Sequence, residues 1–270
     1  MLNSALKTAI DIAYSAGEIL RDGFSQPHRI NQKADATDLV TETDQAAEKL
    51  IIECLRSTFP DHSILGEEGG AQNVAEAQYR WIIDPLDGTT NFAHGIPHFS
   101  VSIALVDAEG WPIVGVIYDP TRDECFAASK GNGATLNGQP IHVSRTPKLS
   151  QAVVASGFPY DKWHDPRNNA DLWAHFVVRS RGVRRFGSAA LDLAYVAAGR
   201  FDGYWEQKLN AWDIMAGVLL VQEAGGNVSG FDGTSAFIHA IKPDIVASNG
   251  LFHEEILTVI RLGEKAPRPI

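Results

Sequence analysis

Acidic side chains occur at three separate points of the chain, each time where a short apolar run gives way to a loop or a helix. Glu67 follows one such run, Asp84 and Asp87 follow a second, and Asp213 stands at the third. Strand ends in layered α/β proteins commonly meet in one crevice, so these carboxylates are expected to converge. Like charges at short distance raise one another's pKa values unless cations neutralise them. The pattern therefore predicts a site that binds cations.

The predicted ligands are oxygen atoms alone, with no paired His or Cys beside them. Such ligands suit Mg²⁺, or Mn²⁺, better than Zn²⁺. Pro85 fixes φ between Asp84 and Asp87, a spacing that would let Asp84 bridge two ions while Asp87 serves one. Two neighbouring ions suit in-line displacement at phosphorus, because one activates water and the other stabilises the leaving oxygen. These residues predict metal-dependent phosphoryl chemistry.

The residues after Asp87 fit the anion that such ions would hold. Gly88 permits close backbone approach, and N–H groups at the start of a following helix hold phosphate oxygens. The Thr89 hydroxyl would accept from the attacking water and pass a proton toward Glu67. Each motif alone also fits a structural turn, a solvated loop or an ordinary helix start. Their combination at successive strand exits favours the catalytic interpretation.

The apolar pattern of the first half predicts two helices packed against a largely antiparallel sheet. Apolar residues over 2–20 recur at helical spacing, and a second helix is expected after Thr43, which would cap it, with Asp44 in its first turn. Strands are expected at 63–65, 81–83, 101–105, 113–118 and 125–128. The first two acidic motifs then follow directly on strands.

The second half alternates between strands and helices, which predicts an α/β (α+β) fold built in packed layers. Strands are expected at 152–155, near 186, at 204–205 and at 244–247, with helices near 172–178, after 188, at 214–223 and at the end. An N-terminal α+β half, residues 1–146, would carry the main metal motifs. A C-terminal α/β half, residues 147–270, would carry the substrate contacts and the last metal ligand. We interpret the two halves as one compact unit.

The composition is that of an ordinary globular protein, with 44% apolar and 21% charged residues among 270. The formal net charge of −10 argues against non-specific nucleic-acid binding, which needs a basic surface. Cys54 and Cys125 form no CxxC pair and are expected to be free thiols in a reducing compartment. No signal pattern and no apolar run approaching the roughly 20 residues of a membrane span is visible. A cytoplasmic location without membrane contact is expected.

The chain resembles the inositol monophosphatase family over nearly its whole length. The resemblance rests on two highly specific blocks, DPLDGTTNF at 84–92 and WDxxAG at 212–217, together with four shorter matches: the stretch from Lys33 through 38–44, Gly66-Glu67-Glu68, 187–190 and Glu206. It implies a layered α-β-α-β-α sandwich of the sugar and inositol phosphatase type. It also implies a small phosphate ester as substrate, Mg²⁺ as cofactor, inhibition by Li⁺ and a homodimer.

The resemblance implies a role for each matching residue. Glu67, Asp84 and the Leu86 carbonyl resemble ligands of a first Mg²⁺. Asp84, Asp87 and Asp213 resemble ligands of a second, and Glu67 would reach a weaker third ion. The metal set is therefore Glu67, Asp84, Leu86, Asp87 and Asp213.

The same resemblance implies the groups that act on water and substrate. Glu67 and Thr89 resemble the pair that orients and deprotonates the nucleophilic water, and Asp44 resembles an acid near Thr89. The substrate-binding residues implied are Asp87, Gly88, Thr89, Ser188, Ala189, Glu206 and Asp213, with the Gly88 and Thr89 amides on phosphate and Glu206 on the polyol.

The leaving group is less firmly indicated than the chemistry. Thr90-Asn91-Phe92 and Glu206 resemble inositol phosphatases, whereas the stretch 207–210 departs from a Gly-containing segment beside the polyol contact. Fructose 1,6-bisphosphate and NADP are therefore alternative substrates. A catalytically silent metal- or phosphate-binding regulator is the non-enzyme alternative, against which intact Glu67, Thr89 and Asp213 argue.

A run of four arginines stands out in an acidic chain. It fits a solvated or subunit-contact face better than a second phosphate site, and it consists of Arg179, Arg181, Arg184 and Arg185.

Overall fold

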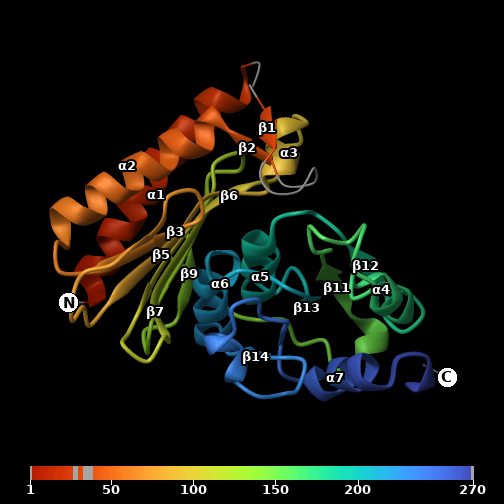
Figure 1. The fold of residues 1–270 in the computed structure, drawn as a ribbon. Helices are drawn as coiled ribbons and strands as arrows, with labels where there is room; N and C mark the ends of the chain where they lie inside the picture. Colours follow the sequence, from red (N-terminus) through yellow and green to blue (C-terminus); the bar gives the residue numbers. More distant parts are fainter. Residues whose placement is uncertain (1, 27–29, 33–38, 269–270) are drawn as a thin grey trace.

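The computed structural model describes residues 2–26, 30–32 and 39–268, which form five layers in the order α-β-α-β-α (Figure 1). Helices form the first, third and fifth layers: α1 (Leu2–Phe24) with α2 (Glu42–Thr58), α5 (Ala189–Ala197) with α6 (Ala211–Glu223), and α4 (Ala170–Val177) with α7 (His253–Leu262). Two sheets form the second and fourth layers. The predicted layered sandwich is confirmed. Lys33 and Asp38, part of the family resemblance, lie outside the described residues.

The first sheet has eight strands, and all of them come from residues before 142. Its order is β10 (Gln139–Ile141), β9 (Ala134–Leu136), β8 (Glu124–Ser129), β7 (Pro112–Asp119), β6 (Ser100–Val106), β5 (Arg80–Asp87), β3 (Ser63–Gly66) and β4 (Gly70–Gln72). Every neighbouring pair is antiparallel except β3 and β5. The parallel pair puts the ends of two strands at the same edge, which is where Glu67 and Asp84 lie.

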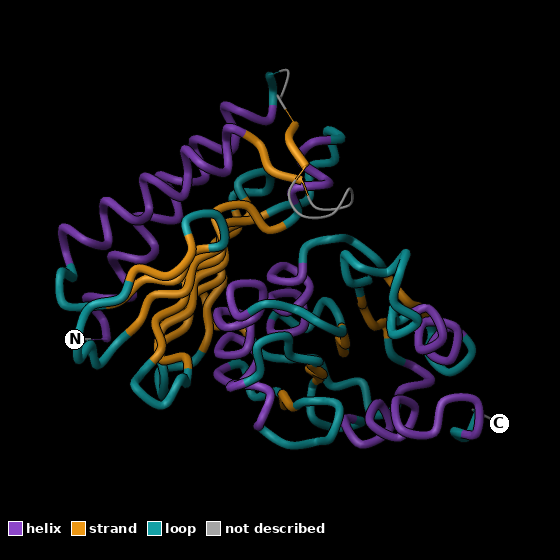
Figure 2. Tube along the Cα trace, in the orientation of Figure 1, coloured by secondary structure: helices purple, strands orange, loops and turns teal. Residues whose placement is uncertain are grey.

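The second sheet has five short strands, most of them connected through helices (Figure 2). Its order is β12 (Gly182–Arg184), β11 (Val153–Ser156), β13 (Gly203–Glu206), β15 (Ile245–Ser248) and β14 (Asn227–Ser229). β11 is parallel to β12 and β13, so these three strands also end at one edge. A two-stranded ribbon, β1 (Ile30–Gln32) with β2 (Leu39–Thr41), and the short helix α3 (Thr89–Ala93) complete the elements beside the site.

Small residues allow α6 to lie directly on the first sheet. Gly115 in β7 faces the backbone of Ala216, and a Cβ at Gly115 would lie 2.8 Å from the Ala216 carbonyl oxygen. Gly217 faces Leu193 of α5 in the same way, so the two middle helices also pack closely. Because α6 is held at this short distance, Asp213 in its first turn is brought to the end of β5.

Two predicted details of the first half are wrong. Thr43 does not cap the second helix, because α2 begins at Glu42 and Thr43 lies within its first turn. The acids Glu42 and Asp44 stand in that turn, where the helix dipole favours negative charge, so the helix extends back to the end of β2. The strand predicted at 81–83 is longer than expected, since β5 continues to Asp87 through an irregular register.

Within the described residues, none of the helices combines the length and apolar character needed to cross a membrane. Cys54 and Cys125 are free thiols, as expected, and Cys125 is buried while Cys54 is half-buried.

Candidate active site

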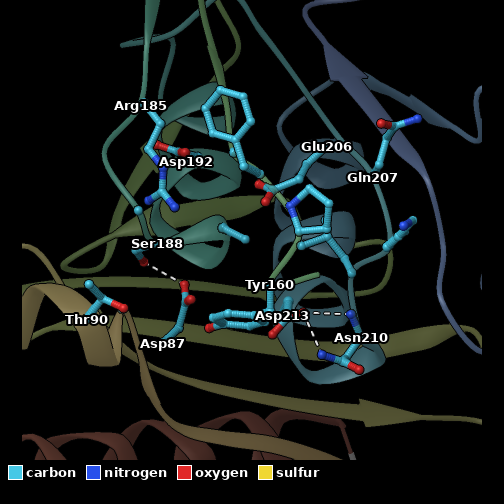
Figure 3. A pocket seen from close by; sticks show the side chains of 18 of the residues that line it. Asp87, Thr90, Tyr160, Arg185, Ser188, Asp192, Glu206, Gln207, Asn210 and Asp213 are labelled. Atoms are coloured by element: carbon cyan, nitrogen blue, oxygen red, sulfur yellow. Dashed lines mark hydrogen bonds between the residues drawn. The ribbon is translucent and has the colours of Figure 1, made fainter. Parts of the chain in front are cut away.

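A polar pocket lies between the two sheets, where α5 and α6 begin and β5 ends (Figure 3). Its lining contains all seven residues expected to bind substrate: Asp87, Gly88, Thr89, Ser188, Ala189, Glu206 and Asp213. Four of these seven come from the second half of the chain. The pocket therefore exists only because the two halves pack against each other.

Asp87 ends β5 and faces the beginning of α5. Its Oδ2 accepts hydrogen bonds from the Ser188 hydroxyl at 2.5 Å and from the Ala190 amide at 2.7 Å. Burial raises the pKa of Asp87 to about 6, although these hydrogen bonds oppose the rise. The start of α5, where the helix dipole favours an anion, thus holds one carboxylate oxygen of Asp87.

Asp213 lies in the first turn of α6, and its Oδ2 accepts from the Asn210 amide at 2.6 Å. This contact closes the helix start and fixes the direction of the carboxylate. Burial raises the pKa of Asp213 well above its ordinary value, and the charges of Asp87 and Glu67 raise it further. Asp213 is thus electrostatically coupled to acids from the other half of the chain.

Asp84 and Glu67 are brought together by the parallel pairing of β3 with β5. Gly66, the last residue of β3, pairs with Ile83 of β5, so Glu67, which follows β3, lies at the level of Asp84. Asp84 is buried, and its Oδ1 accepts from the Leu86 amide at 2.9 Å. Burial raises the pKa of Asp84 well above its ordinary value, and the negative charges of Glu67, Asp87 and Asp213 raise it further. The four acids predicted from the sequence therefore share one electrostatic environment.

Gly88 and Thr89 turn the chain from β5 into α3. Gly88 has φ of 101°, and a Cβ there would lie 3.1 Å from the His98 carbonyl oxygen, so the turn requires glycine. The Thr89 hydroxyl donates to the Leu86 carbonyl at 3.0 Å, which leaves its lone pairs free to accept a hydrogen bond. Asp44 is buried in the first turn of α2, outside the described pocket lining. Its role beside Thr89 stays a prediction.

Glu206 forms the opposite wall of the pocket at the end of β13. It accepts a hydrogen bond from the Tyr204 hydroxyl at 2.6 Å. Burial raises the pKa of Glu206 to about 7, against the opposing effects of Tyr204 and Arg185. A Cβ at Gly157 would collide with the Glu206 carboxylate, so glycine is needed beside it. The Glu206 carboxylate thus forms this wall, and the missing side chain at Gly157 leaves the space that the carboxylate occupies.

Tyr160 and Asp192 also line the pocket, and neither was given a role from the sequence; Arg185 of the arginine run and Lys208 of the stretch 207–210 line it as well. Asp192 is buried, and its Oδ1 has no hydrogen-bond partner among the described residues. Burial raises the pKa of Asp192 well above its ordinary value, and the charges of Glu206 and Asp87 add to this. An acid in the first turn of α5 was the only sequence signal for Asp192, and it equally fits helix capping.

The arginine run divides between two surroundings. Arg181 and Arg184 are exposed, in line with the expected solvated face. For Arg179 that expectation is wrong, because its buried guanidinium donates to the carbonyls of His175, Glu264, Ala266 and Pro267. Arg179 therefore fastens the C-terminal segment to α4.

The donor set fits a hard divalent cation. The acids supply only carboxylate oxygens, and burial, followed by mutual repulsion, raises the pKa values of Asp84 and Asp213. In the described part of the chain, no three or more His, Cys, Asp or Glu side chains already have the closed arrangement of a metal site. Asp87 and Asp213 each direct one carboxylate oxygen to the start of a helix. The residues fit Mg²⁺ in the kind of donor atom that they supply.

Comparison with known proteins agrees with this geometry. A sequence model of the inositol monophosphatase family matches residues 1–263. The chain is 47% identical to the protein named Nus factor SuhB from Pseudomonas aeruginosa, over 97% of this chain and 96% of that one. It is 43% identical to the inositol-1-monophosphatase of a Synechocystis strain, over 94% and 88% of the two chains.

A solved inositol monophosphatase from Anabaena superposes on the chain with a TM-score of 0.88. Its sequence is 43% identical, and the match covers 98% of this chain and 97% of that one. The chain belongs to the inositol monophosphatase family, and it is a phosphatase enzyme. The resemblance inferred from the two motif blocks is thus confirmed.

Proposed function

We propose that this phosphatase hydrolyses inositol monophosphates, such as inositol 1-phosphate, in a Mg²⁺-dependent reaction with direct attack by water. One observation carries the proposal: four acids from three distant motifs share one environment beside the Gly88–Thr89 turn. The pKa values of Asp84, Asp87 and Asp213 are raised, so bound cations would favour the fully charged form of the cluster. Bound Mg²⁺ would supply water activation and stabilisation of the leaving oxygen.

The chain's own residues divide the remaining work. Glu67, Asp84, Asp87, Asp213 and the Leu86 carbonyl would hold two or three Mg²⁺ ions, with Mn²⁺ as a substitute. The Thr89 hydroxyl, whose own proton is directed to the Leu86 carbonyl, would accept a hydrogen bond from the attacking water and orient it, and Glu67 would take the proton that this water loses as its oxygen attacks phosphorus.

The substrate would lie between two backbone and side-chain walls. The Gly88 and Thr89 amides at the start of α3 would hold phosphate oxygens, while Ser188 and Ala189 form the adjoining wall. The roles of Asp44 and of the pocket acids stay predictions that rest on the family resemblance. The homodimer, Li⁺ inhibition, cytoplasmic location and two-half division of the chain likewise stay predictions.

The leaving-group side of the pocket favours an uncharged polyol. Glu206 is a buried acceptor there, and the unpartnered oxygen of Asp192 would be satisfied by a hydroxyl. Both cationic side chains of the lining face acids. Arg185 stabilises the charges of Glu206 and Asp192, and Lys208 binds two aspartates. Lys208 is therefore already neutralised, and the exposed Arg185 is the one cation of the described lining that forms no salt bridge, which weighs against a second phosphate as in fructose 1,6-bisphosphate or NADP.

A substrate panel at fixed Mg²⁺ tests this function. We expect kcat/KM for inositol 1-phosphate to exceed that for fructose 1,6-bisphosphate and NADP by at least about tenfold, since uncompensated charge at a polar wall costs roughly 1–3 kcal/mol. Phosphate release should disappear after exhaustive chelation and return with Mg²⁺. Undiminished activity in the chelated enzyme would contradict the mechanism. Faster hydrolysis of a bisphosphate would contradict the assigned leaving group.

A second candidate function is favoured by one comparison, the name Nus factor SuhB of the Pseudomonas relative. A nucleic-acid-related role by direct RNA contact conflicts with the net charge of −10. We therefore expect a labelled RNA to show no binding tighter than about 1 µM at physiological salt in an anisotropy titration. Saturable binding below that concentration, retained by an inactive variant, would establish the second role and overturn the expectation.

A further inference from the structure

One wall of the pocket is a loop, residues 157–168, that connects β11 to α4. Gly157, Phe158, Pro159 and Tyr160 from this loop line the pocket. In the view of Figure 3, the ring of Tyr160 projects into the same region as Asp87 and Asp213. The position of the loop therefore decides how much space a substrate finds beside the acids.

The base of the loop is fixed by Asn169. Its Nδ2 donates to the Ser156 hydroxyl at 2.8 Å and to the Gly157 carbonyl at 2.5 Å, while its Oδ1 accepts from Trp205 Nε1 at 2.8 Å. These contacts join the two ends of the loop in the protein interior. They do not reach its middle, which extends to the rim of the pocket.

The middle of the loop is fastened by Lys208. The Lys208 ammonium contacts Asp161 Oδ2 at 2.8 Å and Asp165 Oδ2 at 2.7 Å. The lysine side chain is only 12% exposed, whereas those of Asp161 and Asp165 are 49% and 42% exposed. One cation thus ties two points of the loop to the segment that follows Glu206.

The backbone of Lys208 is adapted to this contact. It has φ of 57°, a left-handed conformation that glycine adopts with less strain, and its amide donates to Asp244 Oδ1 at 3.0 Å. Burial opposes the charge of the lysine, yet the hydrogen bonds of Asp161 and Asp165 outweigh it and raise the pKa. Because the main chain alone would favour glycine, the contribution of this residue lies in its side chain.

We propose that Lys208 is a positioning residue that holds loop 157–168 over the pocket and so sets the affinity for the leaving group. The proposal rests on the proposed phosphatase function of the same pocket. Lys208 acts through Tyr160 and its loop neighbours, and it takes no part in the hydrolysis. Since both aspartates are partly exposed, salt screens the two ion pairs and loosens the loop.

The test compares the wild type with Lys208→Gly, which suits the left-handed backbone and removes both ion pairs. Lys208→Arg is the matched control, because it keeps the cation. The double variant Asp161→Asn/Asp165→Asn removes the partners instead and guards against misfolding caused by the change at 208. Circular dichroism confirms that each variant is folded.

Limited trypsin digestion gives the first readout, since trypsin cleaves after Lys162 within the loop. We expect cleavage there to be at least about threefold faster in Lys208→Gly and in the double variant, because proteolysis follows loop opening. Lys208→Arg should resemble the wild type. Equal cleavage in all four proteins would overturn the proposal whether or not the enzyme is active.

Steady-state kinetics with inositol 1-phosphate give the second readout. Lys208→Gly should raise KM about 3- to 10-fold while kcat stays within about twofold, the pattern of a lost binding contribution. Rising NaCl should raise the wild-type KM toward that of Lys208→Gly, whose own KM changes less. A fall in kcat with unchanged KM would overturn the proposal. If the wild type releases no phosphate, the proposed function fails, and the cleavage comparison alone decides the role of Lys208.

Discussion

Replacing Asp213 by asparagine is expected to lower kcat for inositol 1-phosphate by about 10²–10³-fold at saturating Mg²⁺. The predicted second ion would lose a charged ligand, and a contribution of this kind corresponds to roughly 3–4 kcal/mol of transition-state stabilisation. The measurement is steady-state phosphate release, followed by a Mg²⁺ titration to separate weaker metal binding from a slower reaction.

The fold should survive this change. The side-chain carbonyl of asparagine can accept the hydrogen bond from the Asn210 amide, as the Asp213 carboxylate does. The substitution also removes a buried acid whose pKa is raised by burial and by its acidic neighbours. Glu223→Gln is a suitable control at the other end of α6, because Glu223 binds the amides of Gly131 and Gly133 away from the pocket. Turnover in Asp213→Asn within tenfold of the wild type would contradict the metal assignment.

Magnesium is expected to stabilise the protein strongly above pH 7 and much less near pH 5. At about 100 times Kd, a ligand that binds only the folded state adds roughly 2.7 kcal/mol, which for a chain of this size raises Tm by about 5–10 °C. Near pH 5 the acids retain protons and compete with the ion. Thermal unfolding with and without Mg²⁺ across pH 5–8, with ionic strength held constant by KCl, measures the difference.

The sign follows from the raised pKa values. Asp87 has a pKa of about 6 and Glu206 of about 7 in the folded protein, both above the ordinary values of 3.8 and 4.5. The metal-free folded state therefore binds more protons than the unfolded state between roughly pH 4 and pH 7. Its stability is highest below that range and falls as the pH rises through it. An equal Mg²⁺ effect at pH 5 and pH 8 would show that the acid cluster does not bind the ion.

Much of the fold was predictable because local patterns and tertiary packing agree. The alanine-rich helical spacing of α1 and the apolar runs of β6 to β8, which are buried on both faces of the sheet, predict these elements directly. The start of α2 was not predictable, because Glu42, Thr43 and Asp44 all suit the first turn of a helix. Only the preceding strand, β2, decides that the helix begins at Glu42.

The acidic part of the site was predictable for a different reason. Glu67 follows directly on β3, Asp84 and Asp87 lie in the last four residues of β5, and Asp213 lies in the first turn of α6, so topology brings them together. Tyr160 and Lys208 lack such a signal, since both lie in irregular segments whose positions depend on contacts with distant residues. Arg179 was misjudged because its partners are backbone carbonyls, which have no sequence signature.

The absence of a side chain at Gly115 means that a substitution outside the pocket can lower the activity of this enzyme. The spacing between α6 and β7 is set there, with the Ala216 main chain against the sheet and Asp213 one turn away. Displacing reacting groups by about 1 Å can lower the rate about 10²-fold. Gly115→Ala, which adds one methyl group between β7 and α6, would therefore lower activity by shifting Asp213, although position 115 does not contact the substrate. Substitutions in the buried contact between α6 and β7 should accordingly be tolerated as poorly as substitutions in the pocket itself.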